Sequence, residues 1–155
     1  SDLMATMADV LGVDLPDTCA EDSVSNLPLW KDPGSPEVRK DIVHQSIDGS
    51  LSIRRGQYKL ELCPGSGGWS APIPGKEDTT APRFQLYDLS MDISERRNVI
   101  EDHLELASEL KEVLKGYIEN GRRPPGAPQS NNGQRIWNTI GWLDEEDGGE
   151  IKIYK

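Results

Sequence analysis

Apolar and polar residues alternate in the middle of the chain with the period of β-strands. We expect strands over residues 42–47, 51–54, 58–62 and 84–89. Asp48-Gly49, between the first two, is typical of a two-residue hairpin turn in which both positions need a positive φ angle. One face of the strands is apolar and the other polar, which predicts an antiparallel sheet covered on one side.

Two segments have the apolar spacing of helices. Residues 3–11 place an apolar stripe on one helical face, and Gly12 follows as a C-terminal residue. A second helix is predicted from Glu101 to Asn120, with a stripe wide enough to cover the apolar face of the sheet, made of Leu106, Leu110, Val113, Leu114 and Tyr117. The predicted fold is α+β: a four-stranded antiparallel sheet with a C-terminal helix across one face, an N-terminal helix and long loops.

Two stretches interrupt this pattern. The segment 64–83 is a 20-residue excursion with eight Gly or Pro residues, and loops of that length are usually functional or disordered. Residues 133–155 contain Trp137 and Trp142, an acidic run over 144–150 and a strand-like end, which would either add an edge strand or lie on the surface.

Composition narrows the possible partners. The net charge of −10 argues against nucleic acid, because phosphate binding needs a basic surface. No apolar run approaches the length of a membrane span, so none is expected. Cys19 and Cys63 lie far apart in the chain and allow either one disulfide or two separate thiols, and they give almost no support to a zinc site.

Four segments, in order, resemble the arylsulfatase family of the alkaline-phosphatase-like hydrolases. Residues 2–12 are similar to the helix after that family's last active-site strand. Residues 49–60 resemble its I-R-x-G-x-Y-K-L hairpin, residues 85–98 its L-Y-D-L-x-x-D-x-x-E-x-x-N segment, and residues 121–126 its G-R-x-x-P-G stretch. The resemblance implies the C-terminal subdomain of a sulfatase over residues 1–132, with the helix of residues 1–12 packing on an absent N-terminal catalytic domain. Residues 133–155 would be an extension of unknown role.

The resemblance also implies a chemistry that this chain does not carry alone. Family members use a formylglycine made in a C/S-x-P-x-R motif beside a divalent metal, calcium, to hydrolyse aryl sulfates or sulfated carbohydrates. Neither Cys19 nor Cys63 is followed by that motif. We therefore assign no catalytic residue, metal ligand or cofactor to this chain and predict that it is inactive alone. A periplasmic or secreted location is implied by the family only.

Five residues are candidates for facing the substrate of the intact enzyme. Trp69 lies in a Gly-rich loop with Ser66 and Ser70, where an indole could stack on a sugar or aryl ring or instead hold the loop to the body. His44 and Gln45 interrupt a strand with polar groups, although a structural histidine is the commoner case. For other charged side chains we expect ordinary roles: Lys59 and Arg54 as solvated charges on the polar strand face, and Arg122 and Arg123 near the carbonyl end of the preceding helix.

Two other functions remain open from the sequence. The chain could be a non-catalytic carbohydrate-binding module with Trp69, Trp137 and Trp142 as its platform. It could also belong to a related phosphomonoester or phosphonate hydrolase of the same superfamily.

Overall fold

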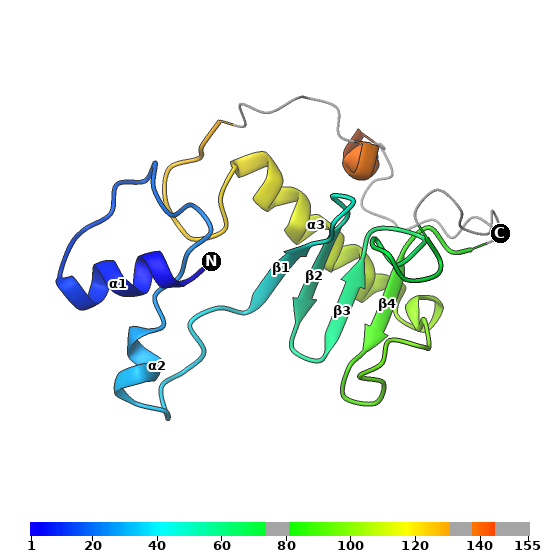
Figure 1. Ribbon diagram of the computed structural model, residues 1–155, viewed down its shortest axis with the longest axis horizontal. Helices are drawn as coiled ribbons and strands as arrows, with labels where there is room; N and C mark the ends of the chain where they lie inside the picture. The colour runs from blue at the N-terminus through cyan, green and yellow to red at the C-terminus, as the bar shows by residue number, and fades with distance from the viewer. Residues whose placement is uncertain (74–80, 131–137, 145–155) are drawn as a thin grey trace. The chain divides into compact units, whose positions relative to one another are not determined.

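The computed structural model describes residues 1–73, 81–130 and 138–144 (Figure 1). The chain divides into two compact units. Unit 1 comprises Ser1–Lys40 and Gly116–Gly133, and unit 2 comprises Asp41–Lys115 and Gln134–Lys155. Among the described residues, no helix is both long and apolar enough to cross a membrane.

Unit 2 is built on the predicted sheet. Its strands are β1 (Asp41–Gln45), β2 (Leu51–Arg55), β3 (Tyr58–Glu61) and β4 (Gln85–Asp88), in the order β1-β2-β3-β4 with every neighbouring pair antiparallel. Ile53 lies opposite Leu60, and Leu60 lies opposite Leu86, so one row of fully buried residues crosses three strands. The predicted antiparallel meander is confirmed.

The long helix α3 (Leu104–Asn120) covers the apolar face of this sheet, which confirms the predicted architecture (Figure 1). It begins later than Glu101 because residues Ile100–Asp102 form a separate 3-10 turn, η1. Its buried side chains are Ala107, Leu110, Lys111 and Leu114. Leu106 and Val113 are only half-buried, so the core stripe is rotated relative to the one that apolar spacing predicts, and it includes a lysine.

The turn between β1 and β2 differs from the predicted two-residue hairpin. The strands end at Gln45 and resume at Leu51, and only Gly49 has a positive φ, of 92°. The side chain of Asp48 explains the wider turn, since its Oδ1 accepts hydrogen bonds from the Ser50 amide at 2.8 Å and the Ser46 hydroxyl at 2.6 Å. These hydrogen bonds to neighbouring residues favour the wider turn over the tight hairpin that Asp-Gly otherwise forms.

The segment after β4 is fixed by one amide side chain. Asn98 Oδ1 accepts hydrogen bonds from the Leu86 and Ile100 amides at 2.9 and 3.0 Å, and its Nδ2 donates to the Phe84 carbonyl. Asn98 therefore ties the start of β4 to the turn that leads into α3. This contact gives the asparagine of the L-Y-D-L segment a structural role.

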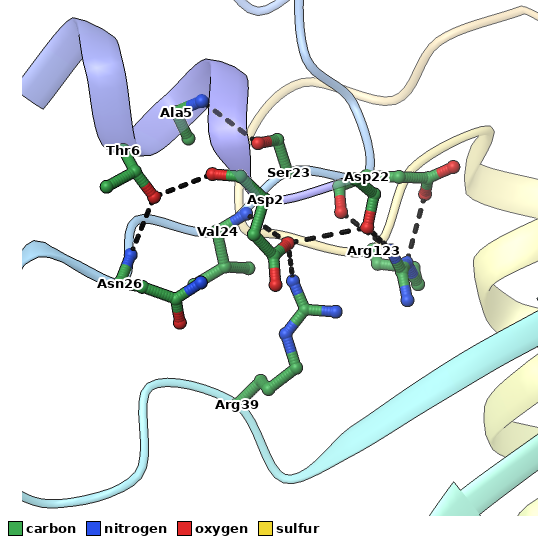
Figure 2. Close-up of polar contacts among 10 residues, drawn as sticks. Asp2, Ala5, Thr6, Asp22, Ser23, Val24, Asn26, Arg39 and Arg123 are labelled. Atoms are coloured by element: carbon green, nitrogen blue, oxygen red, sulfur yellow. Dashed lines mark hydrogen bonds and ion pairs between the residues drawn. The ribbon is translucent and has the colours of Figure 1, made fainter. Parts of the chain in front are cut away.

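Unit 1 contains α1 (Leu3–Leu11) and the short α2 (Leu27–Lys31). Polar contacts join α1 to the loop of residues 22–26 (Figure 2). The buried Thr6 hydroxyl donates to the Asp2 carbonyl and accepts from the Asn26 amide, while Ser23 accepts from the Ala5 amide. The Asp2 carboxylate does not cap its own helix but pairs with Arg39. Side-chain hydrogen bonds, more than apolar packing, hold the first turn of α1 in place.

We expected Arg122 and Arg123 at the carbonyl end of α3. The Arg122 backbone amide does donate to the Tyr117 carbonyl there, at 3.2 Å, but the side chains of both arginines bind other loops of unit 1. The guanidinium of Arg122 is buried and donates to four backbone carbonyls, those of Asp17, Pro124, Pro125 and Ala127. Arg123 pairs with Asp22 at 3.2 Å. A buried guanidinium must satisfy its five N–H groups, and a loop curled around it supplies more acceptors than a helix end does.

Candidate substrate-facing site

The β1–β2 turn and the loop of residues 64–73 meet at one end of the sheet. The Asp48 amide donates to the Gly67 carbonyl at 3.3 Å, and a Cβ on Gly67 would lie 2.6 Å from the Ser46 hydroxyl oxygen. Gly67 also has a φ of 63°, so both the close approach and the backbone conformation favour glycine. The structure thus brings together two segments that the sequence suggested separately.

The rest of this loop is closed by its own polar groups. The Ser66 amide donates to the Pro72 carbonyl at 2.9 Å, and its hydroxyl donates to the Ser70 carbonyl at 2.7 Å. Gln85 of β4 donates from Nε2 to the Cys63 and Gly65 carbonyls at 2.8 and 2.9 Å. Ser66 therefore acts inside the loop, whereas the Ser70 side chain is exposed.

Trp69 lies at the tip of this loop and is 86% exposed. Within the described residues, none of the contacts that hold the loop uses its indole. The structure thus gives no support to the alternative in which Trp69 holds the loop to the body. Ile47, on the facing turn, is also exposed and lies beside Gly68.

His44 and Gln45 are both exposed on β1, but they point to opposite faces of the sheet. His44 lies opposite Ser52 on the polar face, away from α3, whereas Gln45 lies opposite Leu51. Of the five predicted candidates, Trp69, Ser66 and Ser70 share one loop, and His44 and Gln45 lie just before the turn that contacts it. The fold places all five at the same end of the sheet.

The polar face also carries an ionic cluster that the sequence did not indicate. Lys59 of β3 is not the solvated charge we expected, because its Nζ lies 2.7 Å from Glu61 and 2.8 Å from Glu95 and its side chain is largely buried. Arg54 is exposed, as expected. With two carboxylates on its ammonium, Lys59 is not available to hold a sulfate group.

The protonation of this cluster follows from two acids sharing one base. Burial alone would lower the pKa of Lys59, but hydrogen bonds to Glu61 and Glu95 outweigh it and raise that pKa. Burial raises the pKa of Glu61, and the neighbouring Glu95 adds to the rise while Lys59 opposes it. The pKa of Lys59 and the pKa of Glu61 can both be raised, because a single ammonium cannot fully compensate the burial of two carboxylates.

The remaining reactive groups here are held in their neutral forms. Burial raises the pKa of the Cys63 thiol to about 11, and burial raises the pKa of Tyr87 to about 12. Both cysteines are free thiols in this structure. Within the described ranges no three His, Cys, Asp or Glu side chains are grouped so that they could hold a metal ion.

Trp142 cannot contribute to the platform of three tryptophans that the alternative function requires, because it is buried. Trp142 is buried and donates its indole N–H to the Thr139 carbonyl, within the 3-10 helix η2 (Asn138–Asp144). Trp137 and the acidic run over 145–150 lie outside the described residues, as does the strand-like end. Only Trp69 of the three is presented to solvent by the described part of the chain.

Comparison with known proteins identifies relatives of this chain. No protein-family model matches it. N-acetylgalactosamine-6-O-sulfatase of Bacteroides thetaiotaomicron is 36% identical over 118 residues, which cover 73% of this chain and 22% of that protein. A solved structure from work on the metabolism of multiple glycosaminoglycans by Bacteroides thetaiotaomicron is 37% identical, with a TM-score of 0.58, and the match covers 74% of this chain and 24% of the other.

A more distant structure shares the fold. Ps i-CgsB in complex with k-i-k-neocarrahexaose aligns with a TM-score of 0.51 at 17% identity, over 83% of this chain and 26% of the other. The chain thus spans about a fifth to a quarter of the length of its relatives. The resemblance predicted from the four sequence segments is confirmed, and the chain belongs to the sulfatase family.

Proposed function

We propose that this chain forms the C-terminal subdomain of a sulfatase that removes sulfate from a carbohydrate. The identity of 36% over 118 residues to an N-acetylgalactosamine-6-O-sulfatase is the observation that carries the proposal. It favours a sulfated amino sugar as the substrate class over a simple aryl sulfate, and it favours sulfate over phosphate esters.

The contacts of the family-like segments support this assignment. Lys59 of the hairpin segment pairs with Glu95 of the segment after β4, and Asn98 of that segment holds β4 to η1. Gly126 of the last segment lies against the guanidinium of Arg122. The residues by which the sequence resembles sulfatases are residues that this fold needs for its own structure.

The reacting groups belong, in this proposal, to the larger part of the polypeptide. Cys63 is a neutral thiol with a raised pKa, and the described residues hold no cluster of metal ligands. The formylglycine nucleophile and calcium that the family implies would be supplied elsewhere in the enzyme, and a periplasmic or secreted location would accompany them. This chain contributes structure and an edge of the substrate cleft.

An exposed apolar face on α1 supports the presence of a covering domain. Leu3, Met4, Val10 and Leu11 are at least half exposed, and Met7 is 37% exposed. A helix that shows such a face to water is usually covered by another part of the protein. We propose that the catalytic domain, which accounts for most of the relatives' length, covers this face.

The proposal is tested by comparing the 155-residue chain with the complete polypeptide. The complete protein is expected to release sulfate from N-acetylgalactosamine 6-sulfate in the presence of calcium, whereas the chain alone releases none from this sugar or from an aryl sulfate. Calcium-dependent turnover by the chain alone would contradict the division of roles. Release of phosphate but not sulfate by the complete protein would instead indicate the related phosphohydrolase.

A further inference from the structure

We propose that Trp69 is a stacking platform for a sugar ring of the glycan, outside the position where the sulfate ester is cleaved. This inference rests on the proposed function and adds a binding contact that the reaction itself does not require. It concerns the surface made by Trp69, Ser70 and Ile47, which we call the tip surface.

The first reason is that the loop is ordered without its tryptophan. Gln85 holds one side of the loop, the Asp48 amide holds Gly67, and the Ser66 amide and hydroxyl hold the Pro72 and Ser70 carbonyls. An indole that is 86% exposed gives up hydrophobic stabilisation unless something binds it. A pre-ordered loop also lowers the entropy lost when a ligand binds.

The second reason is the chemistry around the indole. The hydroxyl of Ser70 lies next to it in sequence, and the exposed Ile47 belongs to the turn against which the loop is held. An aromatic face next to groups that form hydrogen bonds suits the C–H face and hydroxyls of a pyranose, since binding sites combine apolar walls with a few polar contacts.

The local charge decides which part of the glycan lies here. Asp48 lies beside Gly67. Burial alone would raise the pKa of its carboxyl, but hydrogen bonds from Ser46 and Ser50 outweigh it and lower that pKa, so the carboxyl is ionised at neutral pH. A carboxylate at this place repels a sulfate group. The ring stacked on Trp69 is therefore one that turns its apolar face to the indole and any sulfate away from it, and the ring being desulfated lies further along the glycan.

Kinetics of the complete protein separate this role from a structural one. Trp69→Ala is expected to lower kcat/KM for an oligosaccharide carrying N-acetylgalactosamine 6-sulfate by roughly tenfold, mainly through KM. The same variant should leave kcat/KM for monomeric N-acetylgalactosamine 6-sulfate unchanged, because that substrate is too short to reach the tip surface. Trp69→Phe should recover most of the loss. Equal losses on both substrates would overturn the proposal and place Trp69 in packing against the catalytic domain.

Binding to the 155-residue chain gives a readout that needs no activity. In a ¹H–¹⁵N NMR titration with the desulfated form of the oligosaccharide, up to about 10 mM, the Trp69 indole N–H signal should shift saturably. Trp30, which is also exposed, is the matched control, and its signal should not move. A Trp69 signal that does not shift would overturn the proposal. An inactive complete protein with a shifting Trp69 would refute the sulfatase function alone.

Discussion

Arg122 shows how one residue can organise a loop that sequence periodicity cannot describe. Its guanidinium lies among the carbonyls of Asp17, Pro124, Pro125 and Ala127, so it joins two distant segments of unit 1. The glycine of the same motif is explained by this arrangement. Gly126 has a φ of 150°, and a Cβ at this position would overlap the guanidinium.

Gly126→Ala is therefore expected to destabilise unit 1 by about 2–4 kcal/mol, because Arg122 must leave its acceptors or the loop must open. Gly116→Ala is the matched control, since a Cβ there meets nothing within 4 Å and the position lies within α3. That change should stabilise by about 0.5–1 kcal/mol. The midpoint of urea unfolding measures both, and equal effects of the two changes would contradict the role given to Gly126.

Glu61 makes a pH-dependent contribution whose sign can be worked out. Its pKa is raised in the folded chain, chiefly by burial, so the folded state binds its proton more tightly than the unfolded state does. The resulting stability is present below the ordinary pKa of 4.5 and is lost as the pH rises through the raised value. Ionised Glu61 therefore costs stability at neutral pH.

We expect Glu61→Gln to be more stable than the parent chain at pH 7 and to lose this advantage near pH 4, where Glu61 is protonated. The amide oxygen can still accept a hydrogen bond from Lys59, which keeps its ion pair with Glu95. Urea midpoints of the two chains, measured from pH 4 to pH 8, give the difference directly. A variant that is less stable than the parent throughout this range would show that the pair with Lys59 outweighs the cost of burial.

The elements of unit 2 follow from apolar spacing because each has one covered face. The alternation in β2 and β3 predicted the sheet, and the stripe of α3 predicted its cover, as Leu60 and Leu110 confirm by being fully buried. The β1–β2 turn was predicted incorrectly because the Asp48 side chain competes with the backbone for hydrogen bonds. Contacts of this kind depend on side-chain geometry, which a pattern of apolar and polar positions does not contain.

The candidate site was harder to predict from the sequence than the fold was. Loop length and the indole indicated Trp69, but nothing local indicated that Gly67 would lie against the turn of residues 46–50. The pairing of Lys59 with Glu61 and Glu95 was also missed, because Glu95 lies 36 residues away in the chain. Alternation placed Lys59 on the polar face correctly but could not show that this face is partly covered.

Leu110→Ala tests whether α3 is held by the sheet. This side chain is fully buried, so its truncation should cost about 2–5 kcal/mol through lost burial and the cavity left behind. Leu104→Ala, in the first turn of the same helix and 41% exposed, is the control and should cost much less. Thermal unfolding followed by circular dichroism compares them, and similar costs would mean that the helix does not rely on this face.

At the scale of the whole molecule, apolar surface is distributed unevenly between the two units. Unit 2 buries its apolar rows between α3 and the sheet, whereas the apolar residues of α1 remain in water. Only Thr6 is buried in α1, and it is held by hydrogen bonds. The stripe of apolar residues correctly predicted a helix here. Within the described part of the chain, however, the stripe stays exposed.

The double variant Leu3→Gln with Leu11→Gln should therefore behave differently in two contexts. In the 155-residue chain it should change stability by less than about 0.5 kcal/mol, because both side chains are exposed. In the complete polypeptide it should cost roughly 3 kcal/mol or more, since burial of one leucine is worth about 1.5–3 kcal/mol. Met91→Gln, at a still more exposed position outside α1, should have little effect in either context. If the complete polypeptide tolerates the double variant as well as the short chain does, the catalytic domain does not cover α1.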